Sequence, residues 1–330
     1  MKFREARAPR PRRGLVLSVM ERVVECVPNF SEGRDPRVVE SLVEAVESVA
    51  GAVVLGTHVD ADHNRSVVTF VAPPEVVVEA AVRVVARAAE LIDLSRHAGQ
   101  HPRMGACDVL PFVPVRGTSV EECVALAHEA GRRIWGELQI PVYFYESAAL
   151  KEERRNLADV RRGGFELLRE QIATVPERAP DVGVCRVHPT AGACIVGVRP
   201  LLIAYNVTLK TGDLSVAKRI ARAVRGRDGG LPHLKALGFE LESRGVVQVS
   251  MNLTSYERTN LHHAFEAVRR EAEALGVEVL ASEIVGLVPR SALHAAAAHF
   301  LKLENYTPDV VLENRIAAAL ERKRAERGGA

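Results

Sequence analysis

Short apolar runs and longer Ala/Val-rich stretches alternate along residues 23–115 in a regular order. The short runs predict strands, and the longer stretches predict helices. A helix is expected to begin after Asp35, which fits an N-cap, with Pro36 at the first helical position. A second helix is expected from Pro74 toward Leu94. The strands fall near 23–27, 53–57, 67–71 and 109–113.

The next stretch is less regular. Ser119 and Glu122 form the pattern of a capping box, which predicts a helix from there to about Leu138. A strand is expected at 141–145, followed by a charged, helical segment over 151–171. Residues 174–193 contain several prolines and glycines, so we interpret them as an interdomain linker or an ordered binding loop.

The strand and helix order of residues 23–115 recurs in residues 201–281. Strand, helix, two strands, helix and strand is the split βαβ, or ferredoxin-like, pattern. Two copies predict an α+β protein of two duplicated subdomains, and 330 residues are enough for two domains of ordinary size. We place the subdomains at 20–180 and 181–330, after a disordered extension or start-site artefact at 1–19.

Composition narrows the class of protein. Hydrophobic residues make up 47% and charged residues 26%, and no apolar run approaches the roughly 18 residues of a membrane span. The five cysteines are odd in number and never spaced as CxxC, which favours reduced thiols in a cytoplasmic protein. The chain has 44 Lys and Arg residues and 42 Asp and Glu residues, and residues 1–19 contain six of the basic residues and one of the acidic residues. The rest of the chain therefore has 38 basic and 41 acidic residues. This mildly acidic body argues against nucleic-acid binding.

The loop over residues 93–108 is the strongest candidate for chemistry, because titratable residues crowd there between a helix and a strand. His101 precedes Pro102, which favours an extended backbone and ends any helix. Gly99 and Gly105 allow close approach to a ligand. We interpret His101 as a general acid and base, with a backbone-capping loop histidine as the alternative, and His97 as supporting structure.

Three motifs carry a resemblance. They are Ser-Arg-His at 95–97 with His-Pro-Arg-Met-Gly-Ala at 101–106, Asp108 and 111–117; Val-Glu-Cys-Val-Pro-Asn-Phe-Ser-Glu-Gly at 24–33; and Ser-Glu-Ile-Val-Gly-Leu-Val-Pro at 282–289. Together they resemble the glutamate formimidoyltransferase family over about residues 20–301. That family transfers a formimino group from N-formimidoyl-L-glutamate to tetrahydrofolate.

The resemblance implies roles for particular residues. His101 matches the family's catalytic acid and base, Asp60 is expected to orient it, and Asn64, Arg65 and Arg103 are expected to bind substrate. The resemblance also implies two ferredoxin-like subdomains with the substrates held between them, a homodimer, and tetrahydrofolate as co-substrate without a metal. The cyclodeaminase that is fused to this domain in some animals is expected to be a separate enzyme here.

A further segment aligns by position with the family's folate-binding segment, with an interdomain linker as the alternative. Arg186 within it fits a pterin or a glutamyl carboxylate. The expected folate-binding residues are Gly183, Val184, Cys185, Arg186, Val187, His188, Pro189, Thr190, Ala191 and Gly192.

Three other functions compete with this interpretation. His58, Asp60, Asp62 and His63 resemble the HxHxDH zinc motif of metallo-β-lactamases, except that Asp60 stands in place of a histidine, which would make the chain a metal-dependent hydrolase. The site could instead serve a 5-formyltetrahydrofolate-linked one-carbon transferase. A non-catalytic folate-binding module would bind folate without turnover.

Overall fold

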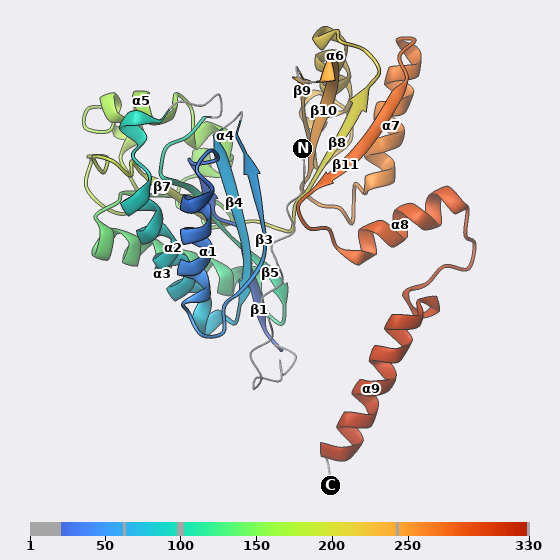
Figure 1. Ribbon diagram of the computed structural model, residues 1–330, viewed down its shortest axis with the longest axis horizontal. Coiled ribbons are helices and arrows are strands. Elements are labelled where there is room, and N and C mark those ends of the chain that lie inside the picture. Colours follow the sequence, from blue (N-terminus) through green and yellow to red (C-terminus); the bar gives the residue numbers. More distant parts are fainter. Residues whose placement is uncertain (1–20, 62–63, 98–101, 242–243, 329–330) are drawn as a thin grey trace. The chain divides into compact units, whose positions relative to one another are not determined.

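The computed structural model describes residues 21–61, 64–97, 102–241 and 244–328 (Figure 1). The chain divides into two compact units, 1–201 and 202–330. Residues 181–201 therefore belong to the first unit, whereas the sequence placed them in the second subdomain. The reason is a strand, β7 (Cys194–Val198), which pairs within the first sheet.

The first unit is built on a mixed sheet. Its strands lie in the order β3–β4–β1/β2–β5–β7–β6, with β1 and β2 occupying one position between β4 and β5. The pairs from β3 to β5 are antiparallel, and β5, β7 and β6 run parallel. The bounds are β1 (Val23–Cys26), β2 (Asn29–Phe30), β3 (Val53–Asp60), β4 (Arg65–Ala72), β5 (Cys107–Arg116) and β6 (Val142–Glu146).

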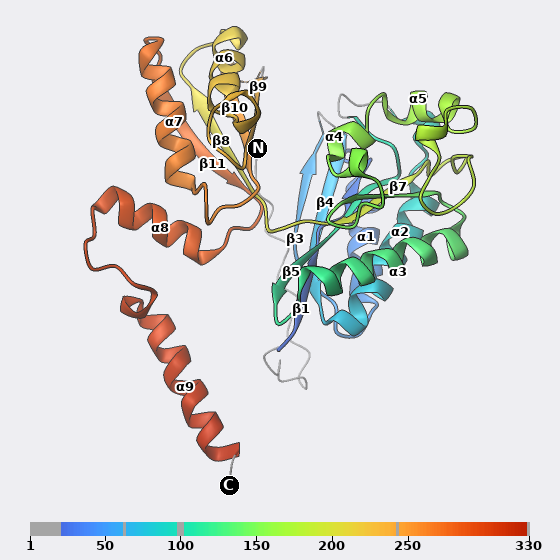
Figure 2. The ribbon, with the colours of Figure 1, turned by 180° about the vertical axis from the view of Figure 1, so that it is seen from behind.

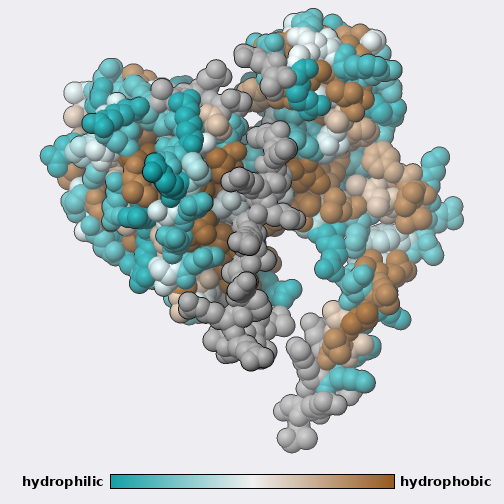
Figure 3. Space-filling view, in the orientation of Figure 1, coloured by the Kyte–Doolittle hydropathy of each residue, from teal (hydrophilic) through white to brown (hydrophobic). Residues whose placement is uncertain are grey.

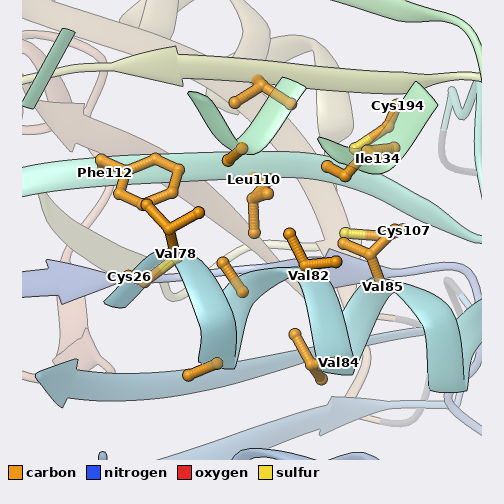
Figure 4. Packing of buried hydrophobic residues seen from close by; sticks show 14 of the residues in the cluster. Cys26, Val78, Val82, Val84, Val85, Cys107, Leu110, Phe112, Ile134 and Cys194 are labelled. Carbon is orange, nitrogen blue, oxygen red and sulfur yellow. The ribbon is translucent and has the colours of Figure 1, made fainter. Parts of the chain in front are cut away.

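Three helices cover one face of this sheet (Figure 1). They are α1 (Pro36–Glu47), α2 (Pro74–Leu91) and α3 (Val120–Leu138). Their apolar sides form the main core with inward residues of the strands, including the thiols of Cys26, Cys107 and Cys194, and Cys194 lies beside Ile134 of α3 (Figure 4). All five cysteines are free, and burial raises the pKa of Cys26 and Cys107. These thiols contribute to the core as small apolar groups.

A second core lies on the other face of β5, β7 and β6. Two short helices cover it, α4 (Leu157–Val160) and α5 (Gly164–Gln171). Tyr143, Tyr145 and Ile195 point into this layer, while their strand neighbours face the main core. Because both faces are covered, β5 is buried along most of its length. Its buried Asp108 forms an ion pair with Arg161 at the end of α4.

Capping residues fix the helix ends where the sequence predicted them. Asp35 accepts the Arg37 N–H at the start of α1, and Ser119 and Glu122 form the expected capping box of α3. The strands predicted near 53–57 and 67–71 are longer than expected, because β3 extends to Asp60 and β4 begins at Arg65. Asp60 and Arg65 are paired across this hairpin.

The second unit contains a four-stranded antiparallel sheet in the order β11–β8–β10–β9 (Figure 2). Helices α6 (Leu214–Val224) and α7 (Leu261–Ala274) pack on one face. The α7 helix begins after Asn260, which caps it. The strands are β8 (Ile203–Leu209), β9 (Leu234–Leu241), β10 (Val246–Leu253) and β11 (Val279–Val285).

Two further helices follow this sheet, α8 (Arg290–Leu301) and α9 (Leu312–Gly328). Hydrophobic side chains gather on their surfaces, among them Phe300, Leu301 and Leu312 (Figure 3). Within the described part of the chain, no helix is both long and apolar enough to cross a membrane.

The contact between α7 and α8 predicts a pH-dependent stability of the second unit. The rings of His262 and His299 stack with centroids 4.4 Å apart, and His263 and Glu266 also face His262. Burial, followed by the neighbouring His263 and His299, lowers the pKa of His262 to about 4. As the pH falls below about 6.5, His262 therefore binds a proton in the unfolded chain before it does so in the folded chain. The free energy of unfolding should decrease by at most about 1.4 kcal/mol per pH unit.

Thermal unfolding at pH 7 and pH 5 measures this loss. His262→Phe keeps an aromatic ring against His299 but cannot titrate, so the variant should lose less stability between the two pH values. An unchanged pH dependence in the variant would contradict the assignment.

Candidate functional site

The motif residues of the first unit meet at one end of its sheet. His101 lies outside the described residues, and the motif is described from Pro102 onward. The Met104 N–H donates to Asp108 Oδ1 at 2.8 Å, and Ser31 Oγ donates to the Gly105 carbonyl at 2.8 Å. These two hydrogen bonds hold Met104 and Gly105, which follow His101, at the start of β5 and next to the end of β2.

Gly105 lies where backbones approach closely. A Cβ atom on Gly105 would be 2.0 Å from the Ala193 carbonyl oxygen, and one on Gly192 would be 2.3 Å from the Met104 oxygen. The two glycines form a bridge, and the Ala193 N–H donates to Met104 O at 2.9 Å. Only glycine leaves room for this contact, which joins the motif to the segment 183–192.

A small cavity lies beside the motif. It has a volume of about 10 Å³, which is the space of about one water molecule or one carboxylate oxygen. Three of the residues expected to bind substrate, Asn64, Arg65 and Arg103, line it together. The other lining residues are Phe30, Ser31, His97 and Asp108.

Asn64 and Arg65 are held rigidly at the β3–β4 hairpin. Asn64 has a left-handed backbone, with φ of 48°, and its Oδ1 accepts the Gly33 N–H at 2.9 Å. Arg65 donates to Asn29 Oδ1. Burial, followed by repulsion from Arg161, lowers the pKa of Arg65 to about 10, so its guanidinium stays charged at neutral pH.

His97, which the sequence analysis interpreted as supporting structure, lines the cavity. Its Nε2 is 3.1 Å from the Asn64 carbonyl oxygen, an acceptor, so the neutral ring carries its proton on Nε2. Its Nδ1 is then an acceptor, and it is buried without a partner in the described part of the chain. Burial, partly offset by the bond to Asn64, lowers the pKa of His97 and favours this neutral form.

Two arginines present unused donors near the cavity. Arg103 donates to Glu166 Oε1 at 2.8 Å and to the His97 carbonyl at 3.0 Å, and Arg161 forms an ion pair with the buried Asp108. Their Nε–H groups are buried and have no partner among the described residues. Buried guanidinium donors of this kind favour an anionic ligand that can accept from them.

The other predicted residues are placed differently. Asp60 ends β3 opposite Arg65 and does not line the cavity, so its role toward His101 stays a prediction. Of the proposed metal ligands, Asp62 and His63 lie outside the described residues. The residues that the structure describes contain no group of three or more side chains placed to hold a metal ion.

The segment 183–192 divides into two parts. Thr190 and Ala191 accept backbone hydrogen bonds from Leu94 and Ala106, at 2.8 and 2.9 Å, and so lie against the motif. The earlier part lines a recess of about 190 Å³ at the end of α3. Its lining residues are Trp135, Gln139, Val184, Arg186, Val187, His188 and Pro189.

Sequence reasoning missed Arg161, Glu166 and Trp135. Arg161 and Glu166 lie in the charged segment 151–171, where the sequence does not distinguish a charged side chain of the site from one exposed to solvent. Asp108 was the only available signal, because a carboxylate within an apolar strand needs a partner. Trp135 carried no signal, since an aromatic residue on a helix usually packs into a core.

Comparison with known proteins decides the family. The model of the formiminotransferase domain's N-terminal subdomain matches residues 23–199, and that of the formiminotransferase domain matches residues 204–323. The chain belongs to the formiminotransferase family. It is therefore a transferase, and formimino-group transfer is its chemistry. The family does not favour the metal-dependent hydrolase.

The relatives support this assignment over most of the chain. The glutamate formimidoyltransferase of Streptococcus pyogenes serotype M1 is 43% identical over 90% of this chain and 99% of that protein. The glutamate formimidoyltransferase of Thermoplasma acidophilum is 45% identical over 90% of this chain and 98% of that protein. The formimidoyltransferase-cyclodeaminase of Gallus gallus is 46% identical over 86% of this chain and 53% of its own length.

Proposed function

We propose that this formiminotransferase moves the formimino group of N-formimidoyl-L-glutamate to N5 of tetrahydrofolate, giving 5-formimidoyltetrahydrofolate and L-glutamate. The names of the bacterial and archaeal relatives support glutamate as the partner. The observation that carries the proposal is the pair of unused guanidinium donors, on Arg103 and Arg161, beside a buried imidazole acceptor on His97.

These groups complement the donor substrate. Its carboxylates accept hydrogen bonds, so they fit the Nε–H groups of Arg103 and Arg161 and the charge of Arg65. Its amidine N–H donates, so it fits Nδ1 of His97. We assign Asn64, Arg65 and Arg103 to substrate binding on this basis, with Arg161 added.

The chemical step needs one proton shuttle. N5 of tetrahydrofolate attacks the amidine carbon and gives a tetrahedral centre. N5 loses a proton, the departing glutamate nitrogen gains one, and the bond between that nitrogen and the carbon breaks. His101 performs both transfers in this proposal, with Asp60 orienting its ring. Holding both substrates in position supplies much of the remaining rate.

We also infer that both units have the ferredoxin-like topology. The first four main strands lie in the order β5–β1–β4–β3, and the second unit has β11–β8–β10–β9. If the four strands of each unit are numbered in chain order, both sheets have the order 4-1-3-2, and neighbouring strands are antiparallel. This shared order supports a duplicated split βαβ unit.

Purified protein with tetrahydrofolate and N-formimidoyl-L-glutamate should release glutamate in step with formation of 5-formimidoyltetrahydrofolate. A reaction that proceeds only with 5-formyltetrahydrofolate would favour the alternative one-carbon transferase. Folate binding without any turnover would favour the non-catalytic module, and loss of activity to a chelator with recovery on adding zinc would favour the hydrolase.

Arg103→Gln tests the carboxylate site. Loss of a charge-assisted hydrogen bond, worth about 1.5–3 kcal/mol, should raise KM for formimidoylglutamate by about 10–100-fold and leave KM for tetrahydrofolate nearly unchanged. Glu166→Gln is the matched control, because the Glu166 side chain is 58% exposed and its ion pair with Arg103 should contribute little. A larger effect from the control than from Arg103→Gln would assign Arg103 to structure.

A further inference from the structure

The turn between α4 and α5 carries two side chains that reach the motif. Arg161 follows α4 and forms an ion pair with the buried Asp108, and Glu166, in the first turn of α5, accepts from Arg103 at 2.8 Å. Gly164 lies against the motif backbone, since a Cβ on it would be 3.3 Å from the Arg103 carbonyl oxygen. The position of this turn therefore sets how its charged side chains meet two residues that line the cavity.

The backbone of the turn has a shape that depends on glycine. Gly163 and Gly164 both have a left-handed backbone, with φ of 81° and 64°, which glycine adopts without steric cost. The carbonyls at the end of a helix need partners from outside its own ladder of hydrogen bonds. The Arg161 carbonyl accepts the Gly164 N–H at 2.9 Å. The carbonyls on either side of it, those of Val160 and Arg162, accept from a side chain.

That side chain is Arg178, which lies in a short 3-10 turn over Pro176–Arg178 and is half-buried. Its Nη2 donates to the Arg162 carbonyl at 2.7 Å, and its Nη1 donates to the Val160 carbonyl at 3.4 Å. One guanidinium thus spans the two carbonyls that flank Arg161. The planar fork of arginine, with several donors in fixed directions, suits a pair of acceptors held apart in this way.

The backbone around Arg178 is held by other residues. Tyr143 Oη in β6 donates to the Arg178 carbonyl at 2.5 Å. Arg154 Nη2 donates to the carbonyls of Glu177 and Ala179, at 3.2 and 2.6 Å. The main chain of this segment is therefore anchored without the Arg178 guanidinium, whose hydrogen bonds go to the α4–α5 turn.

We propose that Arg178 is a positioning residue of the substrate site. By holding the carbonyls on both sides of Arg161, it keeps the Arg161 guanidinium against Asp108, with an Nε–H that has no partner among the described residues. Arg178 is not one of the residues that line the cavity, so it acts through Arg161. This proposal rests on the proposed function, which assigns that Nε–H to a substrate carboxylate.

Steady-state kinetics separate positioning from stability. Arg178→Met should raise KM for formimidoylglutamate about 5–10-fold, while kcat and KM for tetrahydrofolate stay within about two-fold. Tyr143→Phe is the matched control, because it removes the hydrogen bond to the Arg178 backbone and leaves the guanidinium in place. It should lower the melting temperature without raising KM for formimidoylglutamate. An equal rise in KM for both substrates in Arg178→Met, or the same rise in Tyr143→Phe, would overturn the proposal.

A measurement without substrate tests the link between Arg178 and Arg161. Urea unfolding of Arg178→Met, Arg161→Met and the double variant should give losses of stability that are less than additive, because Arg161→Met already removes the group that Arg178 positions. Strictly additive losses would show that the two side chains act independently and would overturn the proposal. The measurement needs no turnover, so a chain that shows this coupling but releases no glutamate from formimidoylglutamate would contradict the proposed function alone.

Discussion

Replacing His101 by alanine is expected to lower turnover by roughly 10²–10⁴-fold, the usual contribution of a positioned general acid and base. Proton transfer matters mainly in the transition state, so KM for both substrates should change much less. The expectation rests on the match of residues 101–106 to the family motif and on the fastening of Met104 and Gly105 beside the arginine-lined cavity.

His97 is the matched control for this experiment. It is a second histidine of the same loop, and its buried Nδ1 acceptor belongs to a residue that lines the cavity. If it only orients the amidine, His97→Ala should raise KM for formimidoylglutamate and reduce turnover less than His101→Ala. Asp60→Asn should show an intermediate defect, because the imidazole of His101 would remain but lose its orienting carboxylate.

The pH profile distinguishes the two histidines independently. In wild type, kcat/KM should show a limb in the imidazole range, near pH 6.5, and this limb should vanish in His101→Ala. The pKa of His97 is lowered by burial, so a limb belonging to His97 would lie below that range and persist in His101→Ala. Loss of activity in His97→Ala with a near-normal His101→Ala would assign the acid and base to His97.

Much of the fold was predictable because local signals agreed with the tertiary structure. Asp35 and the Ser119–Glu122 capping box are short-range signals, and they mark the helix starts that the structure has. Strand β7 was missed because residues 194–198 form a short run after a segment rich in proline and glycine. Its strand character comes from parallel pairing with β5 and β6, which lie far away in the sequence. That pairing also moved the boundary between the units.

Sequence reasoning could single out individual residues of the candidate site. Three of them, Asn64, Arg65 and Arg103, line one cavity, and their role in substrate binding stays a prediction. Arg161 could not be found in this way, because its partner Asp108 is more than fifty positions away in the sequence and only the tertiary fold brings the two side chains together. The recess at Trp135 depends likewise on a contact between a helix end and a distant loop.

Asp108→Ala is expected to destabilise the first unit by about 3–5 kcal/mol, because it leaves the buried guanidinium of Arg161 without its counter-charge. Asp108 is only 3% exposed, and its other oxygen accepts the Met104 N–H at 2.8 Å. The variant therefore also releases the motif backbone. Urea unfolding followed by the fluorescence of Trp135 measures the loss, and this single tryptophan reports on the first unit.

Two matched variants separate charge from hydrogen bonding. Asp108→Asn keeps an acceptor for the Met104 N–H but removes the charge, so its loss of stability should be smaller. Adding Arg161→Met to Asp108→Ala removes the uncompensated charge and should restore part of the stability. The same double variant should still bind formimidoylglutamate poorly, because Arg161 also supplies one of the unused donors, beside the cavity-lining Asp108. Strictly additive losses in the double variant would mean that the two side chains act independently, and wild-type affinity for formimidoylglutamate would remove Arg161 from the substrate site.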